Sequence, residues 1–528
     1  MRYVFSERTR GPGYQFLITF GIALTCFTLF LSACGGSSPQ SSQPKTGGNI
    51  SVGLSSDVVT LDPLKSSALV DRQVMLNLYD TLVKVNAQNN MVPDLATSWS
   101  YTTPLQLMFT LRSGVQFEDG TPFNADAVVF NIQRILSTPS SPRYSEISSV
   151  ASVVAPDATH VQFNLKKPFA PLLAALSDRA GMMLSPAVVK NLGTKLANGP
   201  VNAGSGPFMF SEWVKGDHLT IKKNPHYWVK DSQGNALPYL NSVKYRPFTN
   251  GTVEYSNLET GTINASDSVD PTDISNAKSN PNVVYKQIPG LSFYGIMLNT
   301  KVAPLNNLAV RQAIEWGVNR QEIVSDTLKN VGVVAQGPIP QSSWAYDKNF
   351  APYSYDVNKA KALLAQAGNP KVSFSLLISS GSPLLTQQAQ FIQSELQPTG
   401  ITVNIKQETF ATLLSDTETF NFQAALLGWS GRPDPDGNMY SWFHTGGGNN
   451  SMQYSNPQVD TLLENARSSS DQATRATDYQ KAQAQIAQDA SYVFIYNGVA
   501  IQATTTNVKN YTILPTTIMD FSSVYLGS

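Results

Sequence analysis

Residues 372–405 restrict the fold more than any other stretch of this chain. VSFSLLI (372–378) has the composition of a strand, and ITVNI (401–405) alternates apolar and polar residues as a second strand does. Between them, Ser382 is suited to a helix N-cap and Pro383 to the first helical position. A strand, a helix and a strand in so short a span form a parallel crossover unit. The sequence therefore predicts an α/β sheet in its C-terminal half.

The remainder of the chain repeats this mixture of strands and amphipathic helices. Residues 160–165 and 218–223 alternate as strands do. Asn124 and Asp356 are suited to the N-cap positions of helices. Gly368 occupies a position where a residue in the left-handed conformation commonly ends a helix. Since the chain has 528 residues, two or three domains are expected rather than one core.

The N-terminus has the pattern of an export signal. Arginines precede an uncharged apolar run over residues 16–31, and Leu-Ser-Ala-Cys ends it at Cys34. This ending matches the bacterial lipobox, so residues 1–33 are predicted to be a lipoprotein signal peptide and Cys34 the lipidated first residue. An uncleaved membrane anchor is the alternative. Residues 34–48 then form a flexible tether, which places the protein outside the cytoplasm and attached to the membrane.

Composition excludes several functions. Lys plus Arg and Asp plus Glu are both 37, so no net charge attracts nucleic acid. Of the two cysteines, Cys26 lies in the signal segment and Cys34 is the predicted lipid site, which leaves no thiol for a disulfide, a nucleophile or a zinc site. The four histidines form no HExxH, and no nucleotide-binding glycine motif is present. We therefore expect no metal, no cofactor and no catalytic residues.

The segment GWSGRPDPDGNMYSWF, residues 428–443, is the most suggestive candidate site. Asp434 and Asp436 lie among Trp429, Tyr440 and Trp442. A carboxylate beside aromatic rings suits a pocket that neutralises an ammonium group and stacks on the apolar parts of a solute. A plain turn is the simpler interpretation, because Pro, Asp and Gly all favour turns.

Other chemistry fits this segment poorly. If Gly437 took the glycine position of an EF-hand loop, Arg432 and Phe443 would occupy two positions that require oxygen ligands. GWSG is one residue short of the GxSxG elbow of serine hydrolases. The two aspartates could act as a glycosidase pair only if their pKa values diverged, and nothing in the sequence separates them.

Eight stretches in order resemble one family, the extracytoplasmic solute-binding proteins of ABC importers, family 5, in the branch that binds dipeptides, oligopeptides, glutathione and nickel. They are LDP (61–63), NLYDTLV (77–83), VPDLATSW (92–99), FTLRSGVQFEDGTPFNADAVVF (109–130), GSGPFMF (204–210), KKNPHYW (222–228), VRQAIEWGVNRQEI (310–323) and GWSGRPDPDG (428–437).

The resemblance implies a two-lobed α/β periplasmic-binding-protein fold of type II, in the large peptide-binding class, with an extra subdomain in the N-terminal lobe. Lobe I would comprise residues 49–81, 206–293 and 498–528, with the subdomain inserted at 82–205, and lobe II residues 294–497. It also implies the solute contacts. Asp434 is the first choice as partner of a peptide ammonium group and Asp436 the second, and the other expected contacts are Trp429, Phe410, Tyr440, Ser56, Ser205 and Gly206.

The predicted function is therefore capture of short peptides or peptide-like solutes and their delivery to an ABC permease, by a monomeric, lipid-anchored protein that is not an enzyme. An oligosaccharide or a chelated metal as solute is the alternative within the same fold. An exported hydrolase that uses the two carboxylates is the more distant alternative.

Overall fold

The computed structural model describes residues 44–527. The predicted signal peptide and Cys34 lie outside the described residues. Within residues 44–527, no helix has both the length and the apolar character needed to cross a bilayer.

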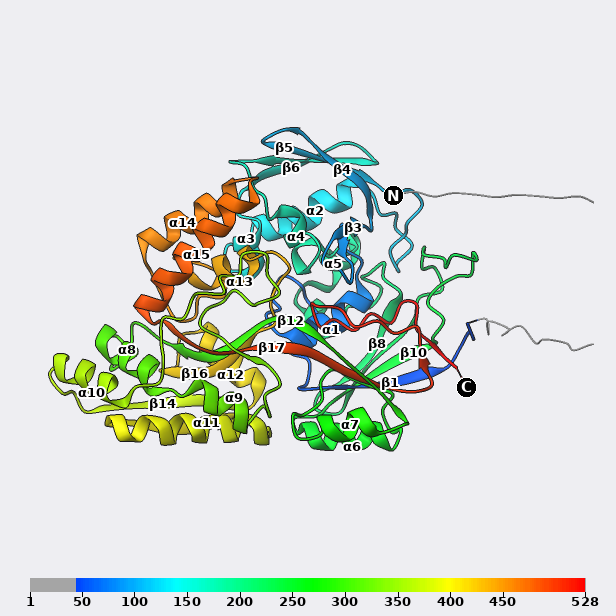
Figure 1. Ribbon diagram of the computed structural model, residues 1–528. Helices are drawn as coiled ribbons and strands as arrows, with labels where there is room; N and C mark the ends of the chain where they lie inside the picture. Colours follow the sequence, from blue (N-terminus) through cyan, green and yellow to red (C-terminus); the bar gives the residue numbers. More distant parts are fainter. Residues whose placement is uncertain (1–43, 528) are drawn as a thin grey trace, which may run out of the picture. The chain divides into compact units, whose positions relative to one another are not determined.

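A mixed sheet of eleven strands runs through the described chain (Figure 1). Ten of its strands follow one another in space: β15 (Ile401–Glu408), β14 (Val372–Ser379), β16 (Ala424–Trp429), β12 (Val283–Leu298), β17 (Tyr492–Thr505), β11 (Ala265–Ser266), β1 (Asn49–Leu54), β10 (Ser242–Pro247), β9 (His218–Lys223) and β8 (Phe208–Val214). The short β13 (Val333–Val334) pairs with β17 beside this path.

Two groups of parallel strands lie in this sheet, with an antiparallel pair between them. Strand β14 is parallel to β15 and β16, and β1 is parallel to β10 and β11. The crossover unit predicted at residues 372–405 is confirmed as β14, α11 (Pro383–Leu396) and β15. Between the groups, β12 and β17 pair along nearly their whole lengths of 16 and 14 residues.

The pairing of β12 with β17 shifts register between Pro289 and Phe293. At this shift the two backbones approach closely at Gly290 and Gly498. A Cβ atom on Gly290 would lie 2.6 Å from the carbonyl oxygen of Gly498, which is closer than real Cβ contacts allow. Only glycine therefore fits where the pairing changes register.

The predicted caps form in the structure. Asn124 accepts a hydrogen bond from the Ala127 N–H at the start of α2 (Ala125–Leu136), at 3.0 Å. Asp356 caps α10 (Val357–Gln366) through the Lys359 N–H in the same way. Ser382 caps α11 at 3.2 Å. Side-chain acceptors at these positions satisfy backbone donors that the helix itself leaves free.

A second, antiparallel sheet contains β4 (Ala96–Thr103), β5 (Gln106–Leu111), β7 (His160–Leu165) and β6 (Val150–Asp157) in that order. Its buried faces pack with α2 around one apolar cluster that includes Phe109, Phe163 and Ile132. The shorter elements near it are β2 (Val83–Val85), β3 (Met91–Pro93), α3 (Pro142–Glu146), α4 (Leu172–Ala175), α5 (Pro186–Leu192) and the 3₁₀ turns Arg179–Gly181 and Gly193–Ala197. All of these elements lie within residues 82–205. The boundaries predicted for the two lobes and the subdomain stay a prediction.

The main sheet is covered by helices. Figure 1 shows α11 beside β14. It also shows α6 (Gly251–Glu259) and α7 (Ile274–Ser279) together near β1. The remaining elements are α1 (Leu69–Leu78), α8 (Leu308–Gly317), α9 (Arg320–Asp326), α12 (Phe410–Glu418), α13 (Asp436–Phe443), α14 (Pro457–Ser468), α15 (Gln472–Asp489), β18 (Val508–Lys509), β19 (Tyr525–Leu526) and the 3₁₀ turn Gln397–Thr399.

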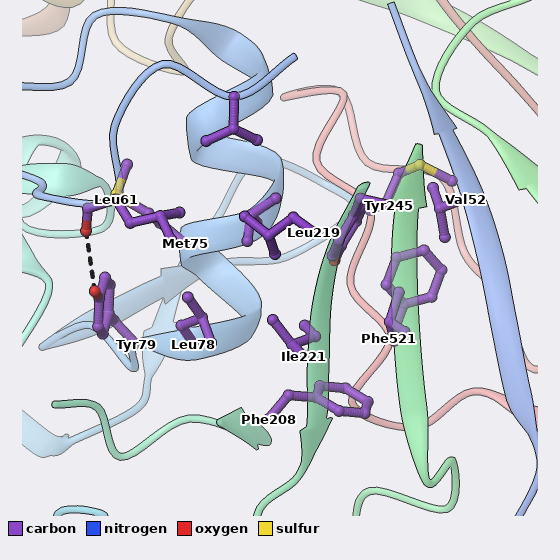
Figure 2. Close-up of a cluster of buried hydrophobic side chains, with 14 of the residues drawn as sticks. Val52, Leu61, Met75, Leu78, Tyr79, Phe208, Leu219, Ile221, Tyr245 and Phe521 are labelled. Carbon is purple, nitrogen blue, oxygen red and sulfur yellow. Dashed lines mark hydrogen bonds between the residues drawn. The ribbon is translucent and has the colours of Figure 1, made fainter. Parts of the chain in front are cut away.

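Figure 2 shows how α1 is held against the sheet. Met75 and Leu78 of α1 belong to the same buried cluster as Leu219 and Ile221 of β9. Complete burial of each such side chain stabilises the fold by about 1.5–3 kcal/mol. Just beyond the helix, the buried Tyr79 hydroxyl donates to the Leu61 carbonyl oxygen at 3.0 Å, so its polar atom is satisfied inside the core. The position of α1, whose N-terminus borders the site described below, is therefore determined by packing.

We expect Gly290→Ala to lower the free energy of unfolding by about 1–3 kcal/mol, because the new methyl group must displace the backbone of Gly498. Urea unfolding followed by circular dichroism measures the change. Gly199→Ala is the matched control, since its Cβ would meet Phe210 at an ordinary 3.6 Å. Equal stability of the two variants would contradict the close approach.

Candidate ligand-binding site

A cavity of about 450 Å³ lies where parallel strands end. Ser55 and Ser56 follow β1, and Asp267 follows β11. On the other side, Ser380 follows β14 and Ser430 follows β16. The carboxyl ends of both parallel groups therefore open into the same space, which is where ligands bind in open α/β sheets. Its volume falls in the range of small-molecule sites, about 300–1,000 Å³.

Aromatic and aliphatic side chains form much of the wall. Trp429 is the last residue of β16, and its indole N–H donates to the Gly437 carbonyl oxygen at 3.0 Å, which orients the ring. The Trp442 ring packs against it, with 5.5 Å between ring centroids. Other apolar lining residues are Phe410, Tyr294, Tyr496, Leu384, Leu385, Leu413 and Leu414. Such a wall favours the apolar parts of a solute.

The charged lining residues all have one sign. Glu254, Asp267, Asp270 and Glu418 border the cavity, and none of the described residues that line it is Lys, Arg or His. The electrostatic potential of the cavity therefore favours a positively charged group.

Two of these carboxyl groups are deeply buried and adjacent. Glu254 on α6 is 1% exposed and Asp267 is 8% exposed. Burial raises the pKa of Glu254 well above its ordinary value, and the nearby charge of Asp267 raises it further. Burial also raises the pKa of Asp267 to about 6, although the Ser55 N–H bonded to it acts in the opposite direction.

Two helices begin at the cavity. Ser67, Ala68 and Leu69 border it at the start of α1, whose N-cap Ala68 has no side chain that could accept a hydrogen bond. Ser382 and Leu384 border it at the start of α11. The helix dipole at such ends favours negative charge, and the start of α1 has no side-chain cap. A solute that carries both an ammonium and a carboxylate group therefore meets complementary charge in this cavity.

Of the predicted contacts, Ser56, Trp429 and Phe410 line the cavity. Asp434 and Asp436 are not among its lining residues. Asp434 forms an ion pair with Arg475 at 2.7 Å, and Asp436 forms one with Arg467 at 2.8 Å. Both instead border a small void of about 30 Å³. Each carboxylate is thus neutralised by an arginine inside the protein.

Ser205, Gly206 and Tyr440 also lie outside the lining. The Ser205 hydroxyl donates to Asp80 at 3.1 Å, and the Gly206 N–H donates to the Leu78 carbonyl oxygen at 3.1 Å. A Cβ on Gly206 would lie 2.7 Å from that carbonyl group, so the glycine lets its loop approach the end of α1. The Tyr440 hydroxyl donates to Glu464 at 2.6 Å. These contacts give the three residues structural roles.

Asp178 is the centre of a buried ionic group that borders the small void. It forms ion pairs with Arg72 at 2.6 Å and with Arg432 at 3.1 Å, and Arg179 is its neighbour in sequence. Burial opposes ionisation of Asp178, but the three arginines outweigh it and hold the pKa of this carboxyl far below its usual range. Arg432 also stacks over the Trp429 ring at 4.3 Å, so the group supports the cavity wall.

Sequence patterns gave no sign of Glu254 and Asp267. Asp267 follows a strand of only two residues, too short for an alternating pattern, and Glu254 lies in a helix without a strongly apolar face. The sequence offered one indirect indication of these two residues: the carboxyl ends of parallel strands lie at the same edge of a sheet, where ligands bind. No group of three or more His, Cys, Asp or Glu residues suited to a metal ion occurs in the part of the chain that the structure describes.

Comparisons with known proteins agree with this geometry. A sequence profile of the bacterial extracellular solute-binding proteins, family 5 (middle region), matches residues 90–450. The probable D,D-dipeptide-binding periplasmic protein DdpA of Escherichia coli K12 is 32% identical, over 88% of this chain and 91% of its own length.

Two solved structures share the fold. DppA of Helicobacter pylori, in complex with the peptide STSA, superposes with a TM-score of 0.83 at 28% identity, over 92% of this chain and 99% of that one. AppA of Bacillus subtilis, in complex with a nonapeptide, superposes with a TM-score of 0.84 at 26% identity, over 92% of this chain and all of that one.

The chain belongs to the family 5 solute-binding proteins of ABC importers. The α/β fold of the large peptide-binding class, predicted from the sequence, is confirmed. Proteins of this family act outside the cytoplasm and bind solutes for transport.

We expect Asp178→Asn to lower the free energy of unfolding by about 3–5 kcal/mol, because it leaves buried arginines without their counter-charge. Urea unfolding at pH 7 measures the effect. Asp126→Asn provides the control, since Asp126 is exposed in the first turn of α2 and its loss changes stability by only about 0.5 kcal/mol. A change of that small size at Asp178 would contradict a structural role for this ionic group.

Proposed function

We propose that this protein captures short peptides or peptide-like solutes outside the cytoplasmic membrane and delivers them to the permease of an ABC importer. The observation that carries the proposal is the charge distribution of the cavity. Buried carboxyl groups border it at Glu254 and Asp267, and the open N-terminus of α1 borders it at Ala68. A zwitterionic solute with apolar side chains matches these charges and the aromatic wall.

The solved relatives support a peptide as the solute. The DppA and AppA structures contain peptides, and the name of DdpA specifies a D,D-dipeptide. We propose that Ser56, Phe410 and Trp429 of this chain contact the solute, since all three line the cavity. The cavity volume of about 450 Å³ favours a solute of a few residues over a long peptide.

We propose further that the protein acts by binding alone, as a monomer with two lobes that enclose the solute. The two aspartates that could have served as a hydrolytic pair are each bound to an arginine and are used in structural ion pairs. The predicted lobe boundaries fit the position of the cavity, which receives residues from segments on both sides of the β12 and β17 pair.

Native mass spectrometry of the protein purified without denaturation, followed by thermal unfolding with added solutes, tests this function. We expect L-Ala-L-Ala, D-Ala-D-Ala, glutathione or Ser-Thr-Ser-Ala to raise the unfolding midpoint. A ligand at a hundred times its dissociation constant adds about 2.7 kcal/mol to stability. Stabilisation only by an oligosaccharide or a nickel chelate would contradict a peptide as solute and favour the alternative solutes.

The lipid anchor is a separate part of the proposal and rests on Leu31–Cys34 and the tether at residues 35–48. In a bacterial host, we expect the protein to incorporate radiolabelled palmitate and to sediment with membranes. Cys34→Ser removes the thiol that carries the lipid, so label incorporation should be lost. Cys26→Ser is the matched control and should retain the label. Label that persists without Cys34 would contradict the assigned lipid site.

A further inference from the structure

We propose that Asp267 and Glu254 together form the binding site for a primary ammonium group of the solute. This inference rests on the proposed function and specifies its substrate class: solutes with a free amine, in preference to their N-acylated forms. It assigns amine recognition to acids that follow β11 and lie on α6, and not to the Asp434–Asp436 segment.

One oxygen of each carboxyl group is already satisfied. The Ser55 N–H and hydroxyl donate to Oδ2 of Asp267 at 3.2 and 3.3 Å. The Ser266 hydroxyl donates to Oε1 of Glu254 at 2.6 Å. These serines orient the two carboxyl groups and bond to only one oxygen of each.

The other two oxygens have no hydrogen-bond partner among residues 44–527. They are Oδ1 of Asp267 and Oε2 of Glu254, which are buried although both side chains border the cavity. A buried acceptor without a donor is costly, so such atoms call for a ligand or an ordered water. A primary ammonium group offers three N–H donors and a positive charge, which is the chemistry that these partnerless carboxyl oxygens lack.

Within residues 44–527, no cationic side chain pairs with these two carboxyl groups. No Lys, Arg or His occurs among the described lining residues, and neither carboxyl group forms an ion pair among the described residues. Asp434 provides the contrast, because its Oδ1 already accepts a hydrogen bond from Arg475. An ammonium group therefore gains more from Asp267 than from Asp434.

The two carboxyl groups should couple binding to pH. The titratable groups that face Asp267 are Glu254 on α6, Tyr294 on β12 and Tyr511, and Asp270 lies three residues further along the chain. All of these are acids, and none supplies a positive charge. Because the pKa of Asp267 is raised to about 6, most of the population is protonated at pH 5 and most is ionised at pH 7.5. A cation binds the ionised form, so affinity should increase from pH 5 to pH 7.5.

The test uses the full-length protein in a non-ionic detergent and isothermal titration calorimetry. The probes are the best-stabilising peptide from the panel above and the same peptide with an acetylated N-terminus. We expect acetylation to weaken binding to the wild-type protein at least about thirtyfold. Asp267→Asn should weaken binding of the free-amine peptide by a similar factor, reduce the difference between the two probes and flatten the pH dependence.

Asp126→Asn, exposed on α2, is the matched control and should bind as the wild type does. Midpoints of thermal unfolding show whether each variant is folded, and the acetylation comparison requires no variant. Equal affinity for the two probes would overturn the proposed ammonium site but leave peptide binding intact. Loss of binding in Asp434→Asn together with full binding in Asp267→Asn would have the same meaning. Failure of every peptide to bind would instead overturn the proposed function, and this inference with it.

Discussion

The pairing of β12 with β17 is the contact on which the rest of the molecule depends. The second half of β12 pairs with β16, whereas the far end of β17 pairs with β11, so this one antiparallel pair joins the two groups of parallel strands. Ser292 of β12 and Gly498 of β17 also border the cavity, next to the register shift. The same backbone hydrogen bonds that unite the sheet therefore place its two sets of strand ends around one space.

The cavity shows why strand direction matters more for this protein than any single motif. Parallel strands end on the same edge of their sheet, so residues distant in sequence, such as Ser56 and Ser380, meet there. Helix N-termini and acidic side chains come to the same edge, so the cavity combines acidic groups, the positive ends of helix dipoles and an apolar wall. Membership of a solute-binding family and the chemistry of the cavity agree with each other, although they rest on separate observations.

The segment GWSGRPDPDG shows how far the role of a charged residue depends on distant partners. Aspartates between aromatic residues suggested a site for a cationic ligand, but Arg467 and Arg475 from α14 and α15 neutralise them. A carboxylate offers its charge to a solute only when the protein has not already paired it. Trp429 from the same segment does border the cavity, because it ends β16 and its indole is oriented by Gly437.

The sequence by itself determined the local structure and the class of the protein. Capping residues such as Asn124 and Ser382, and the crossover unit at 372–405, depend on neighbours a few residues away, and each formed as predicted. The ordered family stretches led to the correct family. Only the tertiary structure decided which charges are available to a solute, because that depends on partners far away in the chain: Asp434 meets Arg475, while Glu254 and Asp267 meet each other at the cavity without a counter-charge.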